Sequence, residues 1–172
     1  LTEKNYIEDF KNNNCWIFGL LKSDKDDIFK RKVTELINYC FNEKKINYNN
    51  IKFLNNKEAE LVKYFRNCYL ATKVSFCNEI YQICKELDIS YENVKELATE
   101  DLRITKSHTS VPGPDGKFGF GGTCFPKDVS ALKNFMEKNN IKSYILDAAF
   151  RRNNEIDRIE KDWSEDKGRA VV

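Results

Sequence analysis

The spacing of apolar positions changes along the chain, and each spacing predicts a different element. Short apolar runs at residues 15–20 and 51–54 suit buried strands, and between them apolar residues recur at helical spacing over residues 26–41. Strand, helix and strand in this order predict a β-α-β unit, the building block of doubly wound α/β domains. Two strands do not form a stable sheet alone, so residues 1–55 are interpreted as the C-terminal end of a larger α/β domain.

The longest periodic segment follows Asn55. Asn55 and Glu58 have the spacing of a capping box, and no Gly or Pro interrupts the next turns, which predicts a helix of about thirty residues. A helix that is apolar on two sides is a central one, covered by other helices or by a partner subunit. One apolar stripe contains Phe65, Tyr69, Thr72, Phe76, Ile80, Ile83 and Leu87, and a second contains Leu70, Val74, Cys77 and Tyr81.

Two polar residues continue the second stripe toward the N-terminus. Asn67 and Lys63 precede Leu70 in steps of three and four, so they share an otherwise apolar face, one turn apart. The spacing by itself favours a lysine that snorkels to the surface over one that is held for a function.

The remainder of the chain predicts a helical domain interrupted by one long loop at residues 101–126. All three prolines and five of the seven glycines lie between Pro112 and Pro126. The predicted fold class is therefore mainly α: a partial β-α-β end of a Rossmann-like domain, followed by a helical domain built on one long central helix. Further helices are predicted at residues 91–99, from Pro126 to about Asn139 and over about 146–163, and a strand begins at 167–172.

Composition narrows the classes of function. The 172 residues carry a net charge of +2, from 29 Lys and Arg against 27 Asp and Glu, and no apolar run approaches the roughly eighteen residues of a membrane span. We therefore expect no nucleic-acid partner, no membrane span and a cytoplasmic location. The chain begins with Leu1 and its only methionine is Met136, so we expect it to be part of a longer polypeptide. The many Asn and Lys residues are interpreted as solvated surface.

The six cysteines do not have the spacing of a disulfide or zinc framework. They lie at positions 15, 40, 68, 77, 84 and 124, without a signal peptide and with His108 as the only histidine. We expect reduced thiols and no metal site. Five of them fit small buried hydrophobic positions.

Cys124 differs from the other five cysteines in its surroundings. The segment GFGGTCFPKD places it between a glycine-rich stretch and a proline that suits the first turn of a helix. Backbone amides at a helix start, together with Lys127, favour a thiolate, and glycines allow a ligand to approach the backbone closely. Asp128 lies in the first turn, near the thiol. Cys124 is thus a candidate nucleophile, although the residues alone leave a structural role open.

The glycine-rich stretch is not a dinucleotide fingerprint. Cys124 stands where the third glycine of GxGxxG belongs, and no predicted strand precedes the run. No Walker motif occurs, so the chain contains no recognisable cofactor-binding turn of its own.

Three segments together resemble the nucleotide-sugar dehydrogenase family, over nearly the whole chain. They are HTSVPGPDGKFGFGGTCFPKD (108–128), KYFRNCYLATKVSFCNE (63–79) and DLRI (101–104). Within the family, the long proline-glycine loop is most similar to members that act on UDP-glucose, and the alternatives are members that act on GDP-mannose or a UDP-N-acetylhexosamine.

The resemblance implies three domains and a homodimer. Residues 1–55 would end an NAD-binding domain, 56–155 would form a central helical dimerisation domain, and 156–172 would begin a UDP-sugar-binding domain. The implied activity is an NAD-dependent oxidation of UDP-glucose to UDP-glucuronate, in two hydride transfers. We expect the chain to be inactive without its flanking domains, and the competing hypothesis is a non-catalytic dimerisation module.

The resemblance also implies residue roles. Cys124 would be the nucleophile, forming a thiohemiacetal and then a thioester; Lys63 and Asn67 would stabilise oxyanions. Asp128 would pair with Lys63 and help to position water. The remaining implied site residues are Glu3 as a catalytic acid, Phe120, Gly121 and Lys127 at the substrate, and Arg103 reaching the site of a neighbouring subunit.

Overall fold

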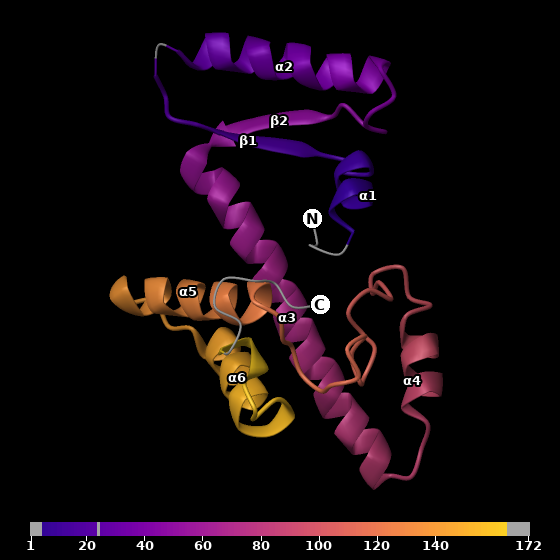
Figure 1. The fold of residues 1–172 in the computed structure, drawn as a ribbon. Coiled ribbons are helices and arrows are strands. Elements are labelled where there is room, and N and C mark those ends of the chain that lie inside the picture. Colours follow the sequence, from indigo (N-terminus) through magenta and orange to yellow (C-terminus); the bar gives the residue numbers. More distant parts are fainter. Residues whose placement is uncertain (1–4, 24, 165–172) are drawn as a thin grey trace. The chain divides into compact units, whose positions relative to one another are not determined.

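The computed structural model describes residues 5–23 and 25–164 (Figure 1). Helices dominate, and the described residues form a single sheet of two strands, which confirms the predicted mainly α fold class. The elements are α1 (Tyr6–Lys11), β1 (Trp16–Leu20), α2 (Asp26–Asn42), β2 (Ile51–Asn55), α3 (Asn56–Glu86), α4 (Tyr91–Ala98), α5 (Cys124–Lys138), α6 (Tyr144–Arg152), the π-helix η1 (Asn153–Asp157) and the 3-10 helix η2 (Asp162–Ser164).

The chain divides into two compact units, residues 1–63 and 64–172, and each is described by itself. The domain boundaries expected from the sequence, at 55 and 155, stay a prediction. The predicted strand at 167–172 lies outside the described residues.

The first unit contains the predicted β-α-β arrangement. Strands β1 and β2 are parallel, with Trp16 opposite Ile51 and Leu20 opposite Asn55, and α2 is the crossover between them. Trp16 is the centre of a small core, and its indole N–H donates to the carbonyl oxygen of Tyr48 at 2.8 Å. The short helix α1 was not predicted, because six residues are too few for a periodic pattern to identify a helix. Phe10 packs edge-on against Trp16, with ring centroids 4.8 Å apart.

A glycine in β1 allows the strand to lie against the start of α3. A Cβ atom built on Gly19 would lie 2.7 Å from the Cα atom of Asn56, closer than such atoms approach in proteins. Any larger residue at this position would push the first turn of α3 away from the strand.

The first turn of α3 has the predicted capping box. The Asn55 side-chain oxygen accepts from the backbone N–H of Glu58 at 2.9 Å, and the Glu58 carboxylate accepts from the backbone N–H of Asn55 at 3.1 Å. Both backbone N–H groups at the junction of strand and helix are therefore satisfied by side chains.

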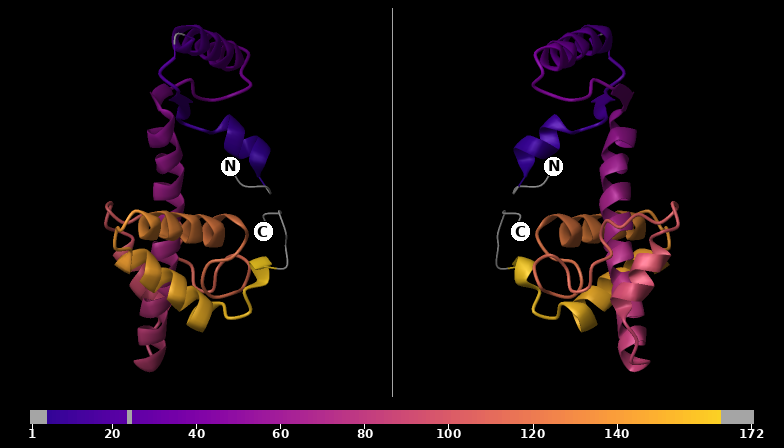
Figure 2. Two further views of the ribbon diagram at one scale, coloured as in Figure 1. Left: turned by 90° about the vertical axis from the view of Figure 1, so that its left-hand side faces the viewer. Right: turned by 90° about the vertical axis from the view of Figure 1, so that its right-hand side faces the viewer.

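In the second unit, the two apolar stripes of α3 differ in how far they are buried. The second stripe is covered: Val74 packs against a core of Cys68, Ala71, Phe120 and Val129, and Cys77 lies in another core with Cys84 and Tyr91. Cys68 and Ala71 lie beside this stripe and belong to neither predicted stripe. Figure 2 shows that α5 crosses α3 near its middle. Most of the first stripe stays at the surface: the exposed fractions of Phe65, Tyr69 and Phe76 are 70%, 60% and 59%, whereas Ile80 packs against the core around Tyr91. Among the helices of residues 5–23 and 25–164, α3 included, none is long and apolar enough to span a membrane.

The loop after α4 accepts hydrogen bonds from side chains of both α3 and α4. The Tyr91 hydroxyl donates to the carbonyl oxygen of Thr109 at 2.6 Å, and burial raises the pKa of this phenol, which keeps it a donor. The Lys73 ammonium donates to the carbonyl oxygens of Thr105 and Ser107, at 2.5 and 2.7 Å. The predicted long loop is thus an ordered part of the unit.

Two predicted helices have different bounds in the structure. Helix α5 begins at Cys124 and not at Pro126, because proline is tolerated throughout the first turn, where backbone N–H groups have no partner within the helix. The prediction of one helix over residues 146–163 is wrong for its second half. Helix α6 ends at Arg152, a π-helix follows, and Arg158 leaves the helical conformation with φ −142° and ψ 62°. The side chains of Asn153 and Arg158 are drawn into the long loop, which periodicity does not reveal.

We predict that the substitution Asn55→Ala lowers the free energy of unfolding by about 1 kcal/mol, the usual contribution of an N-terminal cap. Urea unfolding followed by circular dichroism measures the change. Asn56→Ala, at the exposed next position, is the matched control and should change stability much less. Equal losses in both variants would contradict the assigned role of the cap.

Candidate active site

Cys124 is the first residue of α5 and its side chain is exposed. Cys68, Cys77 and Cys84 are buried, and Cys15 and Cys40 are half-buried. The thiol of Cys124 therefore combines a helix start with access to solvent, the two properties of reactive cysteines. The structural role predicted for the buried thiols agrees with their positions in the cores of the second unit.

Asp128 lies one helical turn after Cys124, which places the two residues on the same side of α5. Its side chain is 1% exposed, and one carboxylate oxygen accepts from the Asn67 amide at 2.6 Å. This hydrogen bond connects α3 to α5 one helical turn from Cys124, and it orients the Asn67 amide and the Asp128 carboxylate relative to each other. The roles predicted for Asn67 and Asp128 stay predictions.

The carboxylate of Asp128 acts on a second thiol. The pKa of Cys68 is raised to about 11, first by burial and second by the negative charge of Asp128. Cys68 is thus protonated at neutral pH, and it packs with Phe120 in the core and not toward solvent. Of these two cysteines, Cys124 is exposed and Cys68 is buried.

The glycine-rich stretch before Cys124 is held by a buried asparagine. The Asn153 side chain, 0% exposed, accepts from the backbone N–H of Phe120 at 2.7 Å and donates to its carbonyl oxygen at 3.0 Å. Gly119 has a φ of +67°, and a Cβ atom there would lie 2.3 Å from the Asn153 side-chain oxygen. The Asn78 side chain accepts from the Gly119 N–H at 3.3 Å. The stretch needs glycine because side chains lie directly behind it.

These contacts refine the roles predicted for Phe120 and Gly121. The Phe120 ring is buried in the core, 6.4 Å from the Phe125 ring centroid, and both of its backbone groups are bound to Asn153. Gly121 is half-buried. Gly121 is therefore the residue of the pair that is better placed for the predicted substrate contact, which stays a prediction.

The other predicted site residues lie at the surface of their helices or loops. Lys127 is largely exposed, with its ammonium 3.9 Å from an Asp128 oxygen. Arg103 is exposed and its guanidinium pairs with the carboxylate of Asp101, whose pKa is lowered by that contact. Lys63 is exposed one turn before Asn67 on α3, and its predicted pairing with Asp128 stays a prediction. Glu3 lies outside the described residues.

Comparison with known proteins places this geometry in a family. The family model described as UDP-glucose/GDP-mannose dehydrogenase family, central domain, matches residues 57–155, which contain Asn67, Cys124 and Asp128. The chain belongs to the UDP-glucose/GDP-mannose dehydrogenase family.

Individual dehydrogenases of this family are similar to the chain over most of its length. It is 32% identical to a UDP-glucose 6-dehydrogenase of Rickettsia bellii over 100% of the chain and 38% of that protein. It is 31% identical to a UDP-glucose 6-dehydrogenase of Pseudomonas aeruginosa over 89% of the chain and 31% of that protein. A UDP-glucose dehydrogenase structure from Pyrobaculum islandicum matches with 30% identity and a TM-score of 0.68, over 86% of the chain and 30% of that structure. The chain spans about a third of the length of these relatives.

The β-α-β arrangement of the first unit does not itself fit a dinucleotide. The connection from β1 to α2 contains no glycine, and Asp26 and Asp27 open the helix. A dinucleotide pyrophosphate needs backbone amides and not carboxylates at such a helix start. Across residues 5–23 and 25–164, no group of three His, Cys, Asp or Glu side chains could hold a metal ion.

Sequence reasoning missed Asn153 and Arg158, the two side chains behind the glycine-rich stretch. Both are buried, as is Asn78. The interpretation of the many asparagines as solvated surface is thus wrong for Asn78 and Asn153, because their amides bind backbone of the loop. The sequence offers one weak signal for these contacts. Asn153 and Arg158 lie close together in a segment with few apolar residues after a helix, which could have suggested that they bind other parts of the chain.

We predict that Cys124 is the first cysteine alkylated by brief iodoacetamide treatment near neutral pH. It is exposed at a helix start, whereas Cys68 is buried with a pKa of about 11. Peptide mapping by mass spectrometry measures the order of labelling, and denatured protein is the control in which all six cysteines react. Early labelling of Cys68, Cys77 or Cys84 with Cys124 unmodified would contradict an activated thiol at Cys124.

Proposed function

We propose that this chain is the central part of an NAD-dependent UDP-glucose 6-dehydrogenase, which converts UDP-glucose to UDP-glucuronate. Residues 1–55 would end the NAD-binding domain, 56–155 would form the helical dimerisation domain, and 156–172 would begin the UDP-sugar-binding domain. The family membership and the UDP-glucose 6-dehydrogenases among the relatives support this proposal. The observation that carries it is the exposed thiol of Cys124 at the start of α5, one turn from a buried carboxylate held by Asn67.

Cys124 suits a two-step oxidation. Its thiolate would add to the C6 aldehyde, forming a carbon–sulfur bond while the carbonyl electron pair moves to oxygen. Loss of a hydride from this thiohemiacetal would leave a thioester, and attack by water would release the carboxylate and the thiol. Two NAD molecules, bound outside this chain's own β-α-β turn, would in turn accept one hydride each, the first from the C6 alcohol as it becomes the aldehyde and the second from the thiohemiacetal. A thiol suits these steps because it is nucleophilic and also leaves readily.

Asn67, Asp128 and Lys63 would act on the charges that form. Each tetrahedral stage carries an oxyanion, which the Asn67 amide and the Lys63 ammonium would stabilise from one face of α3. The buried Asp128 carboxylate is fixed by its 2.6 Å hydrogen bond, so it could accept a proton from water in the hydrolytic step. The Asn67 amide thus has two proposed tasks, orientation of Asp128 and stabilisation of the oxyanion.

Members of the same family that act on GDP-mannose or a UDP-N-acetylhexosamine are the alternatives for the substrate. A panel of these three nucleotide sugars, each with NAD and the complete protein, separates them by the ratio of kcat/KM values. Turnover of GDP-mannose alone would overturn the proposed substrate and leave the proposed chemistry of Cys124 in place.

We predict that Cys124→Ser in the complete protein lowers the rate of acid formation by roughly a thousandfold or more. A serine hydroxyl forms and breaks the acyl intermediate far less readily than a thiolate, whereas the first hydride transfer does not need the thiol. Product analysis by chromatography measures acid and aldehyde separately. Cys15→Ser is the matched control and should retain wild-type turnover, and unchanged acid formation in Cys124→Ser would exclude the thioester route.

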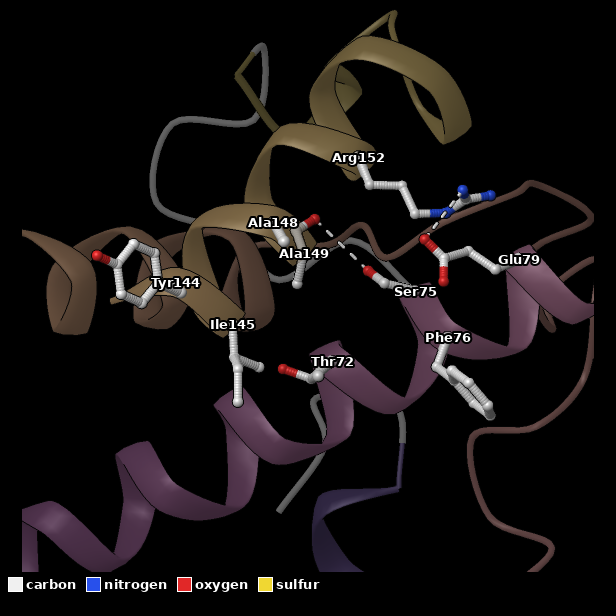
Figure 3. A pocket seen from close by; sticks show the side chains of 9 residues that line it. All are labelled: Thr72, Ser75, Phe76, Glu79, Tyr144, Ile145, Ala148, Ala149 and Arg152. Atoms are coloured by element: carbon white, nitrogen blue, oxygen red, sulfur yellow. Dashed lines mark hydrogen bonds and ion pairs between the residues drawn. The ribbon is translucent and has the colours of Figure 1, made fainter. Parts of the chain in front are cut away.

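A homodimer through α3 is the second part of the proposal. The first apolar stripe of α3 is exposed at Phe65, Tyr69 and Phe76, and large apolar faces of this kind mark protein interfaces. A groove of about 320 Å³ between α3 and α6 adjoins Phe76 (Figure 3). Tyr144 and Ile145 border it from α6, with exposed fractions of 78% and 70%. A second copy would bury this continuous surface around a two-fold axis.

We predict that the double substitution Tyr69→Glu and Phe76→Glu converts the dimer to a monomer. Two carboxylates would have to be buried without partners in the interface, which costs more than the interface supplies. Light scattering at micromolar concentration measures the mass. Phe135→Glu on α5, where the side chain is also 60% exposed, is the matched control and should stay dimeric. A monomeric unsubstituted protein would exclude this part of the proposal.

A further inference from the structure

A single buried arginine connects the glycine-rich stretch to the segment after α6. Arg158 is 4% exposed, and its guanidinium donates to the Asp115 carboxylate at 2.7 Å from Nη2. The same guanidinium donates to both Asp162 oxygens, at 2.8 Å from Nε and 2.8 Å from Nη2. Arg158 therefore joins the long loop to η2 by charge-assisted hydrogen bonds, the stronger kind in proteins.

The face of the same guanidinium lies against the backbone beside Cys124. A Cβ atom built on Gly121 would lie 2.2 Å from Cζ of Arg158 and 2.5 Å from each of its Nη atoms. Gly121 is therefore glycine because the guanidinium occupies the space where a side chain would be. Arg158 thus fixes the loop at two points, Asp115 by hydrogen bonds and Gly121 by contact.

The Asp162 carboxylate, which accepts from Arg158, stays ionised. The pKa of Asp162 is held well below its usual range, chiefly by the hydrogen bond from Arg158 and further by Lys117. Because the pKa is lowered in the folded state, this pairing stabilises the fold above the pKa of the unfolded side chain and is lost only in strong acid. The Lys117 ammonium of the loop lies 2.7 Å from the Asp162 carboxylate, which gives a second ion pair between the loop and η2.

We propose that Arg158 is a positioning residue for the nucleotide-sugar site: through Asp115 and Gly121 it holds the loop in the conformation that receives the substrate next to Cys124. This inference rests on the proposed function. It separates two parts of the site, because Cys124 is positioned by α5 and by the Asn67–Asp128 hydrogen bond, neither of which involves Arg158. Loss of Arg158 should therefore weaken substrate binding more than it slows the chemistry of the thiol.

The test measures steady-state kinetics of the complete protein. Arg158→Met is expected to raise the KM for UDP-glucose about tenfold, the effect of losing one charge-assisted hydrogen bond, while kcat changes about threefold or less. The KM for NAD should stay unchanged. Arg158→Lys keeps the charge and one hydrogen bond, so its KM should lie between those of the wild type and Arg158→Met.

Two further variants show whether the effect passes through Asp115. Asp115→Asn should reproduce the rise in KM. The double variant with Arg158→Met should add little to it, because both substitutions remove the same contact, the one between Arg158 and Asp115. Arg151→Met is the matched control: this arginine, also near the end of α6, is exposed and pairs only with Glu155 at 3.3 Å. It should retain the wild-type KM.

Hydrogen exchange of residues 113–122 gives a readout that does not depend on activity. Arg158→Met should accelerate exchange in this segment and leave α5 protected. Unchanged exchange, a wild-type KM, or an equal fall of kcat in Arg158→Met and Cys124→Ser would each overturn the inference. If the wild-type protein does not oxidise UDP-glucose, the proposed function fails, and the exchange of residues 113–122 still decides whether Arg158 holds the loop.

Discussion

The burial of one face of α3 is the constraint on which the second unit depends. Ala71 is 0% exposed and Cys68 is 3% exposed, and the groups that cover them are Phe120 of the loop and Val129 of α5. Covering this face draws the glycine-rich stretch and the start of α5 to the same part of α3. The Asn67–Asp128 hydrogen bond lies at the edge of that contact, so apolar packing also brings the polar groups next to Cys124 within reach.

The glycine-rich stretch owes its composition to what lies behind it. Its glycines suggest a loop left open for a ligand, yet Gly119 faces the Asn153 amide and Gly121 faces the Arg158 guanidinium. Both side chains are buried and hydrogen-bonded, so the backbone in front of them is held and not free. A pre-organised loop loses little conformational freedom when a ligand binds, so less free energy is needed to order it.

The last helix is interrupted because Asn153 and Arg158 bind the glycine-rich loop and its neighbours. A helix continued from Arg152 to Trp163 would satisfy its own backbone and would direct Asn153 and Arg158 by helical geometry alone. In the structure a π-helix intervenes, Asn153 binds both backbone groups of Phe120, and Arg158 binds Asp115 and Asp162. Insertion of a residue into the helical ladder is a common device at functional sites, because it redirects side chains at a small cost in hydrogen bonding.

The sequence by itself determined the elements whose cause is local or periodic. The capping box at Asn55, the β-α-β order, the length of α3 and the special setting of Cys124 all follow from spacing, and the structure has them. Only the tertiary structure decided which stripe of α3 is covered, where α6 ends and what lies behind the glycines. The physical reason is that Asn153 contacts Phe120, and Arg158 contacts Asp115, across more than thirty residues of sequence, so neither local propensity nor periodicity carries a signal of those two contacts.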